Sequence, residues 1–453
     1  MRTRRVGIVV GGGPAPGINA VIGAATIEAI NRGYEVIGFY DGFRWLSIDD
    51  FDPGRHAVRL EIPQVARIHF DGGSILRTSR TSLLNEERLK SSTVVEPDVA
   101  KVKRVVSHVA LMGISNLITI GGDDTALSAK FICEASGGDF RLVHVPKTID
   151  NDLPLPHDIP TFGFSTARFT GAQIVKNLMQ DSQATGRWYL ATAMGRKAGW
   201  LALALGQSAG ATVTLIPEEF TEDTTIHAIA DVLEGAMLKR RIMGRDDGVA
   251  VVAEGLAYHL GDREELQRLL GKEVPVDAAG HPRLAEVPLG DMLKAELQAR
   301  FKARGEKISL VTYELGYEMR SADPTPKDMS YCRSLGHGGI LLLLDESGAA
   351  SQGLLVTLVN GNLVPMKLTE MIDAQTQRMK TRLVDVSSYE YQVARAYQIR
   401  LEQSDLENPS RLGELAAQAR MTAEEFRQRY LRAATRLVEA QPVNAEAAVV
   451  EAE

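Results

Sequence analysis

The sequence has few cysteines, no excess of positive charge and no long apolar run. Its 453 residues include only Cys133 and Cys332, and neither has the spacing of a zinc site or a disulfide framework. The formal net charge is −7, so we expect neither nucleic acid nor a membrane as a partner, because binding a polyanion requires clustered basic residues. No apolar stretch approaches the roughly 20 residues that span a bilayer. These absences predict a protein of the reducing cytoplasm.

Strand-like apolar segments alternate with helical patterns along most of the chain. Residues 6–10 precede a helical pattern that begins at Ile18, and residues 98–112 carry a stripe of valines typical of an amphipathic helix. With 44% hydrophobic residues, the length suffices for two or three domains. The alternation predicts an α/β fold with two doubly wound, mostly parallel sheets. The other predicted strands are residues 34–39, 117–120, 142–145, 188–193, 211–216, 248–253, 308–314 and 354–359.

The C-terminal part differs in character. Beyond about residue 388, charged helical patterns replace strands, and helices are predicted over 390–402 and 422–439. The stretch 271–288 is polar and rich in Pro and Gly, which favours a loop or small insertion. Residues 442–453 have no usable pattern and are expected to form a frayed tail. A helical extension is therefore expected after the α/β core.

Two loops directly follow predicted strands and carry most of the chemistry. Gly-Gly-Asp-Asp-Thr occupies residues 121–125, and Pro-Lys-Thr-Ile-Asp-Asn-Asp occupies residues 146–152. In an open α/β sheet, ligands bind beyond the carboxyl ends of the strands. Four carboxylates and one lysine are thus delivered to one edge of the sheet, which outlines a site for a metal and phosphate.

Each loop also has a structural alternative. Asp123 suits Mg²⁺, which takes one or two carboxylates together with phosphate oxygens and water, but Asp123 and Asp124 would equally suit the N-cap of a helix. In the second loop, Asp150 could be a base, Asp152 a helper through metal or water, and Lys147 a cation. The alternative there is an Asx-rich turn. The two loops in combination favour the functional interpretation.

A glycine loop at residues 11–17 follows the first strand. It lacks the third glycine of a dinucleotide fingerprint, because Pro16 stands there, and no Gly-Lys-Ser/Thr follows as a Walker loop requires. Its backbone N–H groups could approach a phosphate at the start of a helix. The alternative is a simple strand-to-helix turn.

Polar residues also follow three later strands. These are Met-Gly-Arg at 194–196, Glu254 and Arg320. With Arg187, the arginines could bind a phosphate through their guanidinium forks, and Glu254 could accept hydrogen bonds from sugar hydroxyls. The alternative for each is a surface salt bridge of little consequence.

Taken together, these motifs resemble the phosphofructokinase family over residues 5 to about 385. By that resemblance an active site lies between two domains: residues 1–157 with 318–372 for the phosphate donor and Mg²⁺, and residues 158–317 with 373–388 for the sugar phosphate. Residues 389–453 form the helical extension. The motifs occur in the family's order: Gly-Gly-x-Ala-Pro-Gly-x-Asn at 12–19, Gly-Gly-Asp at 121–123, Thr-Ile-Asp-Asn-Asp at 148–152, Met-Gly-Arg at 194–196, Glu-Gly at 254–255 and Leu-Gly-x-x-x-Arg at 315–320.

The resemblance implies a role for each motif residue. Asp150 is the base that acts on the 1-hydroxyl of fructose 6-phosphate, with Asp152 as its helper, and Asp123 is the magnesium ligand. Arg187 reaches the neighbouring subunit's site, which implies a homodimer or larger homo-oligomer. The phosphate donor is bound by Gly12, Lys147 and Arg80, with Arg77 a nearby candidate. The sugar phosphate is bound by Thr148, Ile149, Asp150, Met194, Gly195, Arg196, Glu254, Tyr317 and Arg320.

Two departures from the ATP-using members bear on the donor. Asp124 replaces the second glycine of Gly-Gly-Asp-Gly-Ser, and Lys147 replaces the glycine of Pro-Gly-Thr-Ile-Asp; both changes resemble the pyrophosphate-dependent branch. A carboxylate at Asp124 would occupy and repel the place of a nucleotide α-phosphate, while Lys147 adds positive charge beside the two phosphates that remain. We therefore expect Mg²⁺-dependent, reversible phosphoryl transfer from pyrophosphate to fructose 6-phosphate, giving fructose 1,6-bisphosphate and phosphate.

Three alternatives stay open at this point. The chain could be an ATP-dependent enzyme with an unusual donor site, or it could accept other sugars such as sedoheptulose 7-phosphate. It could also be a catalytically silent regulatory subunit that keeps the fold.

Two further positions depart from the ATP-using members, which have His at the place of Tyr317 and an arginine near the place of Val311.

Overall fold

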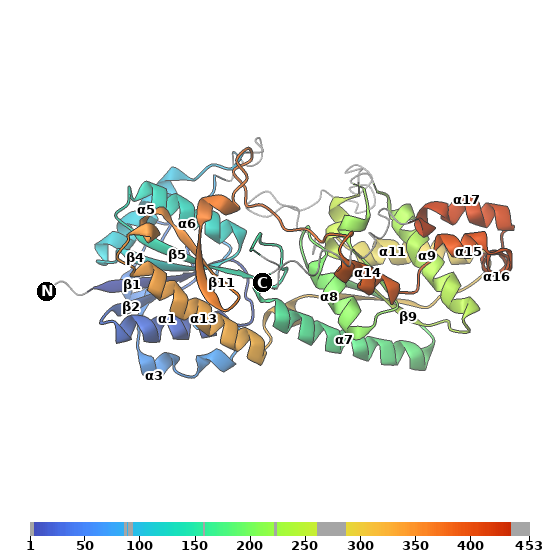
Figure 1. Cartoon of the computed structure of the whole chain (residues 1–453), viewed down its shortest axis with the longest axis horizontal. Coiled ribbons are helices and arrows are strands. Elements are labelled where there is room, and N and C mark those ends of the chain that lie inside the picture. The colour runs from blue at the N-terminus through green and yellow to red at the C-terminus, as the bar shows by residue number, and fades with distance from the viewer. Residues whose placement is uncertain are drawn as a thin grey trace, which may run out of the picture. The chain divides into compact units, whose positions relative to one another are not determined.

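The computed structural model describes residues 4–85, 88, 94–156, 159–221, 224–260 and 287–435. This part of the chain forms two compact units (Figure 1). The first unit contains residues 4–171 and 315–382, and the second contains residues 172–260, 287–314 and 383–435. No helix in these ranges combines the length and apolarity that a bilayer crossing requires.

The first unit is built on a mixed sheet with the strand order β12-β11-β5-β4-β1-β2-β3. Its central strands are parallel, whereas the β2–β3 and β11–β12 pairs are antiparallel. The expected parallel sheet therefore has antiparallel strands at both edges. The strands are β1 Arg5–Val10, β2 Glu35–Phe39, β3 Ala57–Leu60, β4 Asn116–Gly121, β5 Arg141–Thr148, β11 Leu354–Val359 and β12 Asn362–Lys367, and β6 Phe162–Gly163 pairs with β5.

The order of the strands reverses next to β1. The chain runs from β1 to β2 on one side and later returns to β4 on the other side, and β1 is parallel to both. Helices on opposite sides of the sheet diverge at such a switch point, which leaves a crevice beyond the carboxyl ends of the strands. Gly11 directly follows β1 and Gly121 ends β4. Two of the predicted motif loops therefore flank the switch point.

Helices cover both faces of this sheet (Figure 1). On one face α1 Ile18–Asn31 packs against α13 Pro326–Leu343, and the approach is close, because a Cβ added at Gly336 would lie 2.5 Å from the Val21 carbonyl oxygen. The other face carries α5 Val99–Leu111 and α6 Asp123–Ala135. Asp98 caps α5, as the predicted helix over 98–112 requires. Shorter helices are α2 Pro53–His56, α3 Ile62–Val65 and α12 Tyr317–Arg320, with 3₁₀ turns η1 Ile68–Phe70, η5 Ala349–Gln352 and η6 Leu368–Met371.

The second unit contains a smaller sheet with the order β10-β7-β9-β8. All residues of β7 and β9 are buried, as is typical of parallel strands that are covered on both faces. The strands are β10 Leu310–Leu315, β7 Trp188–Ala193, β9 Gly248–Ala253 and β8 Val213–Leu215; the helices are α8 Trp200–Ala209, α9 Ile226–Ile242 and α11 Leu289–Ala303, with η2 Pro217–Glu219 and η3 Glu254–Tyr258. The long helix α7 Phe164–Thr185 contains the division between the units.

The helical extension packs against α9 and belongs to the second unit. Leu238 of α9 shares a buried cluster with Leu415, Phe426 and Tyr430. The predicted boundaries make the extension a separate part. The contact with α9 explains why it belongs to the second unit instead. Residues 373–382, predicted with the sugar domain, group with the first unit instead. The helices are α14 Tyr389–Ala396, α15 Gln403–Glu407, α16 Pro409–Ala419 and α17 Ala423–Ala434.

The helix predicted over 390–402 was wrong beyond Ala396. There the backbone leaves the helix and binds the start of β8, because the Ile399 N–H donates to the Thr212 carbonyl and the Gln398 side chain accepts from the Thr214 N–H. Tertiary hydrogen bonds override the helical pattern. Most of the predicted loop at 271–288, the end of the helix predicted over 422–439, and the tail at 442–453 lie outside the described residues.

A buried carboxylate ties α13 to the start of α7 in the first unit. Asp328 is 2% exposed and accepts from the Gly163 N–H, the Thr166 N–H and the Thr166 hydroxyl. Asp328→Ala leaves these donors without an acceptor, so it should destabilise the protein by about 2 kcal/mol. The measurement is the urea unfolding midpoint, with Lys327→Ala, an exposed neighbour on α13, as the control. Equal midpoints for the two variants would contradict this role of Asp328.

Candidate active site

The glycine loop after β1 is held against the end of β4 by close backbone packing. The Gly11 N–H donates to the Ile120 carbonyl at 2.8 Å, and the Gly12 N–H donates to the Ser79 carbonyl at 2.8 Å. A Cβ at either Gly11 or Gly121 would collide with the buried side chain of Thr125. Only glycine fits at both positions, and the loop is thereby fixed above the switch point.

The carboxylates at the start of α6 are not its N-cap. The N-cap is Gly122, and Asp123 and Asp124 are the first residues of the helix itself. Thr125 is not the cap either, because it packs inside against the two glycines. The alternative is therefore wrong about the N-cap position. Its other part, that the helix dipole favours these carboxylates, stands, because both lie in the first turn of the helix.

Lys147 is the electrostatic centre of this half of the site. It lies at the end of β5, is 5% exposed, and donates from Nζ to the Gly13 carbonyl at 2.5 Å. The pKa of Lys147 is lowered to about 8: burial lowers it most, the positive charges of Arg320 and Arg80 also lower it, and the carboxylates of Asp150 and Asp123 partly oppose this. The fold thus brings five of the predicted residues within electrostatic reach of one another.

Hydrogen bonds from neighbouring segments fix the loop that carries Asp150. The Asp150 N–H donates to the Thr148 hydroxyl at 3.0 Å. Asn151 has a left-handed backbone (φ +58°), and its side chain accepts from the Thr161 N–H at 3.0 Å. Arg382 donates to the Asn151 carbonyl at 3.0 Å, and its own N–H donates to the Asp152 carbonyl at 2.7 Å. The turn that was expected as the structural alternative is therefore present, and its hydrogen bonds fix the backbone that carries Asp150 and Asp152.

Two of the supporting residues were missed by the sequence reasoning. His144 on β5 is fully buried, and its ring nitrogens lie 2.9 Å from the Thr119 hydroxyl and 3.1 Å from the Gly121 carbonyl of β4. Burial lowers its pKa to about 3, so it is neutral. A polar residue inside the apolar run 142–145 was a signal for it. Nothing in the sequence near Arg382 indicated that it holds the loop of Asp150.

Arg320 and Tyr317 lie in the first unit, beside the glycine loop. A Cβ at Gly13 would collide with the Arg320 guanidinium, and this guanidinium lies 5.4 Å from the centre of the Tyr317 ring. Arg80 directly follows Ser79, the acceptor for the glycine loop. Arg77 instead pairs with Asp41 at 3.4 Å. Arg80 and Arg77 are the two candidates for binding the phosphate donor on this segment, and of these Arg77 already has an ion-pair partner.

The second unit carries a separate half-site at the ends of β7 and β9. The Glu254 carboxylate accepts from the Gly195 N–H at 3.1 Å and from the Arg196 N–H at 2.8 Å. Arg196 has a left-handed backbone (φ +53°), uncommon for a residue with a side chain. Burial raises the pKa of Glu254, and the two N–H groups counteract this. Glu254 thus shapes the turn that presents the Arg196 side chain.

Gly255, part of the Glu-Gly motif, and Glu218, which was not predicted from the sequence, complete this half-site. A Cβ at Gly255 would lie 2.5 Å from the Arg196 carbonyl oxygen and 2.7 Å from Pro217 Cγ, so only glycine fits. Glu218 accepts from the Gly199 N–H at 2.9 Å and from the Val384 N–H at 3.0 Å. The residues after β8 therefore support the turn after β7.

Within the second unit Arg187 does not join Arg196 and Glu254. It directly precedes β7, whereas Arg196 and Glu254 follow the carboxyl ends of the parallel strands β7 and β9. The opposite ends of these strands cannot share one ligand. This placement keeps Arg187 apart from the half-site of its own unit.

Among the described residues, no group of three or more His, Cys, Asp or Glu side chains is placed to hold a metal ion. Mg²⁺ can bind through one or two carboxylates, with waters and phosphate oxygens as its other ligands. Asp123, predicted as the metal ligand, lies within electrostatic reach of Lys147.

Comparison with known proteins identifies the family of this chain. A sequence model of the family described as "Phosphofructokinase" matches residues 5–342. The chain belongs to the phosphofructokinase family. A pyrophosphate--fructose 6-phosphate 1-phosphotransferase of Thermotoga maritima is 50% identical to this phosphofructokinase over 426 residues, which are 94% of this chain and 98% of that protein. One of Naegleria fowleri with the same name is 43% identical and covers 93% of this chain and 94% of its own.

Solved structures share the fold of this phosphofructokinase. The crystal structure of a pyrophosphate-dependent phosphofructokinase from Marinobacter aquaeolei matches with a TM-score of 0.61 at 17% identity, over 87% of this chain and 90% of that chain. At such low identity the match concerns the fold alone. The predicted fold class is confirmed: an α/β protein with mixed, mostly parallel sheets and a helical C-terminal region.

Proposed function

We propose that this phosphofructokinase transfers a phosphoryl group from pyrophosphate to the 1-hydroxyl of fructose 6-phosphate. The products are fructose 1,6-bisphosphate and orthophosphate, and the reaction runs in both directions. The observation that carries the proposal is the buried Lys147 ammonium group, which is bonded to Gly13 of the glycine loop and surrounded by the charges of the site. The names of the two relatives support the same donor and acceptor.

The donor side neutralises the diphosphate. Lys147 and Arg80 supply positive charge, and the Gly12 region lets the backbone come close to an anion, because Gly12 has φ +81° and no side chain. Asp123 holds Mg²⁺, which neutralises charge on the transferred phosphoryl group when bound. In phosphoryl transfer, positioning and charge neutralisation make up most of the catalysis.

The acceptor side uses the second loop and the second unit. The Asp150 carboxylate takes the proton of the 1-hydroxyl while that oxygen attacks the terminal phosphorus of pyrophosphate. The bond from this phosphorus to the bridging oxygen breaks, and orthophosphate leaves. Asp152 assists Asp150. The sugar phosphate is bound by Thr148, Ile149, Met194, Gly195, Arg196, Glu254, Tyr317 and Arg320.

Arg187 serves a second copy of the chain in this proposal. Its position at the amino end of β7 separates it from Arg196 within the same unit, and a guanidinium is suited to a phosphate group. The active form is then a homodimer or larger homo-oligomer, because each site takes one arginine from a neighbour.

Asp124 accounts for the choice of pyrophosphate over ATP. It lies in the first turn of α6 beside Asp123, where a third phosphate and its nucleoside would have to extend. A second carboxylate there repels a longer anion, whereas pyrophosphate ends before it. Placing like charges together is an effective way to reject a competing ligand.

The proposal is tested by the initial rate with fructose 6-phosphate and Mg²⁺, with pyrophosphate or ATP offered in parallel. We expect turnover with pyrophosphate and less than about one hundredth of that rate with ATP, because like charges placed side by side cost several kcal/mol. Asp124→Gly combined with Lys147→Gly should narrow this difference. Turnover with ATP alone overturns the donor assignment, and no turnover with either donor overturns the proposal.

Asp150→Asn keeps the size of the side chain and removes the base. Turnover should fall by about 10²- to 10⁴-fold, while the KM for fructose 6-phosphate changes little. Asp139→Asn, in an exposed turn of the same unit, is the matched control and should keep full turnover. Near-normal turnover of Asp150→Asn would sink the assignment of the base.

Lys147 should give the enzyme a pH dependence. Its pKa is lowered to about 8, so the positive charge is present below that pH and is lost above it. The value of kcat/KM for pyrophosphate, which reports the free enzyme, should therefore fall above about pH 8. In Lys147→Arg this fall should move out of the measured range, because guanidinium stays charged. A fall that persists unchanged in Lys147→Arg would show that another group titrates.

A further inference from the structure

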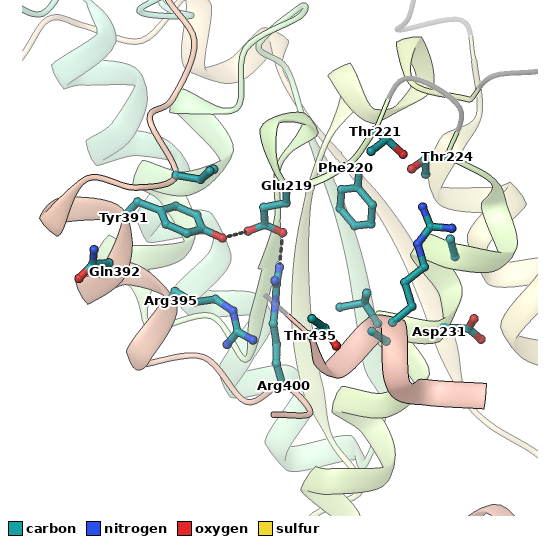
Figure 2. A pocket seen from close by; sticks show the side chains of 15 residues that line it. Glu219, Phe220, Thr221, Thr224, Asp231, Tyr391, Gln392, Arg395, Arg400 and Thr435 are labelled. Carbon is teal, nitrogen blue, oxygen red and sulfur yellow. Dashed lines mark hydrogen bonds and ion pairs between the residues drawn. The ribbon is translucent and has the colours of Figure 1, made fainter. Parts of the chain in front are cut away.

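A pocket in the second unit has no part in the proposed reaction. It lies among η2, the first half of α9, α14 and the last turn of α17, and residues of all four line it (Figure 2). The space that atoms leave free there, its open mouth included, is about 990 Å³. The helical extension thus contributes one wall of a pocket that the α/β core alone would not form.

Three arginines line this pocket: Arg395, Arg400 and Arg432. Arg395 and Arg400 are 5% and 6% exposed, and burial together with the charge of Arg400 lowers the pKa of Arg395 to about 10. Nη1 of Arg395 lies 2.9 Å from the Glu402 carboxylate, but neither it nor Nε of Arg400 makes a hydrogen bond within the described residues. Arg395 is thus held in an ion pair, whereas Nε of Arg400 is a buried donor without a hydrogen-bond partner among the described residues.

The acidic residues of the pocket are already occupied. Glu219 accepts from the Tyr391 hydroxyl at 2.6 Å and from Arg400 at 2.7 Å (Figure 2). The Asp231 carboxylate lies 2.6 Å from the guanidinium of Arg300, which is outside the pocket. Neither carboxylate balances Arg432, which is exposed at the end of α17 and has no ion pair among the described residues. The pocket therefore has an unbalanced positive charge.

We propose that this pocket binds a small phosphate monoester with an apolar or ring-shaped body. The apolar part faces Phe220, Val232 and Val386, which line the pocket with the arginines. The phosphate group faces Arg432, whose guanidinium fork can donate to two of its oxygens. The site goes beyond the proposed reaction, which uses no group of this pocket.

The pocket is next to the sugar half-site, so a test has to tell the two apart. Pro217 of η2 is the residue that a Cβ at Gly255 would meet at 2.7 Å, and Glu219 of the same turn lines the pocket. Phenyl phosphate is a suitable probe, because it has one ring and one phosphate group but no sugar hydroxyl and no diphosphate. Its binding to the full-length protein is measured by isothermal titration calorimetry without other phosphates.

We expect saturable binding of phenyl phosphate to the wild-type protein. Arg432→Ala should weaken it by about tenfold, as expected for the loss of a charge-assisted contact, and this exposed residue can be replaced without disturbing the fold. Arg427→Ala, on the same helix, and Arg196→Ala, in the sugar half-site, should each bind like the wild type. No saturable binding up to about 10 mM, an unchanged affinity in Arg432→Ala, or a loss caused by Arg196→Ala would each overturn the proposal.

Discussion

The donor half of the site depends on one steric constraint, the fit of Thr125 beneath two glycines. The Thr125 side chain occupies the space where Gly11 and Gly121 would each carry a Cβ. This contact fixes the start of α6 against the loop after β1, at the point where the order of the strands reverses. The carboxylates of Asp123 and Asp124 and the glycine backbone are positioned by the same packing. A larger residue at either glycine would move all of them together.

The charges of the site depend on this packing in turn. Lys147 is buried because it reaches under the glycine loop to the Gly13 carbonyl. A buried ammonium group is costly unless carboxylates or an anionic ligand lie near, and Asp150 and Asp123 lie within electrostatic reach. The pKa near 8 indicates that these two do not fully compensate burial. In the proposed reaction, the diphosphate supplies the negative charge that these two carboxylates leave uncompensated.

The motif residues could be predicted from the sequence because they stand at strand ends, and strands with their following loops are local patterns. The bounds of β7, β9 and β11 were predicted without error, whereas those of the helix over 390–402 were not, because residues 398–400 instead make hydrogen bonds to Thr212 and Thr214 at β8. Arg382, Glu218 and Asp328 were missed for the same reason. Each acts through hydrogen bonds to backbone groups far away in the sequence, such as that from the Arg382 N–H to Asp152, and no local pattern encodes these.

By itself the sequence determined the class of fold, the family and the chemical groups of the site, because periodicity and short motifs reflect local physics. Only the tertiary structure decided the protonation of these groups and the backbone conformation that holds them. The lowered pKa of Lys147, the neutral His144 and the left-handed turn at Arg196 result from burial and from hydrogen bonds between distant segments. The arginine-lined pocket also exists only because α17 packs against α9 and α14 binds η2 through the hydrogen bond from Tyr391 to Glu219. Burial and distant contacts depend on the whole packed chain, so no single stretch of sequence reveals them.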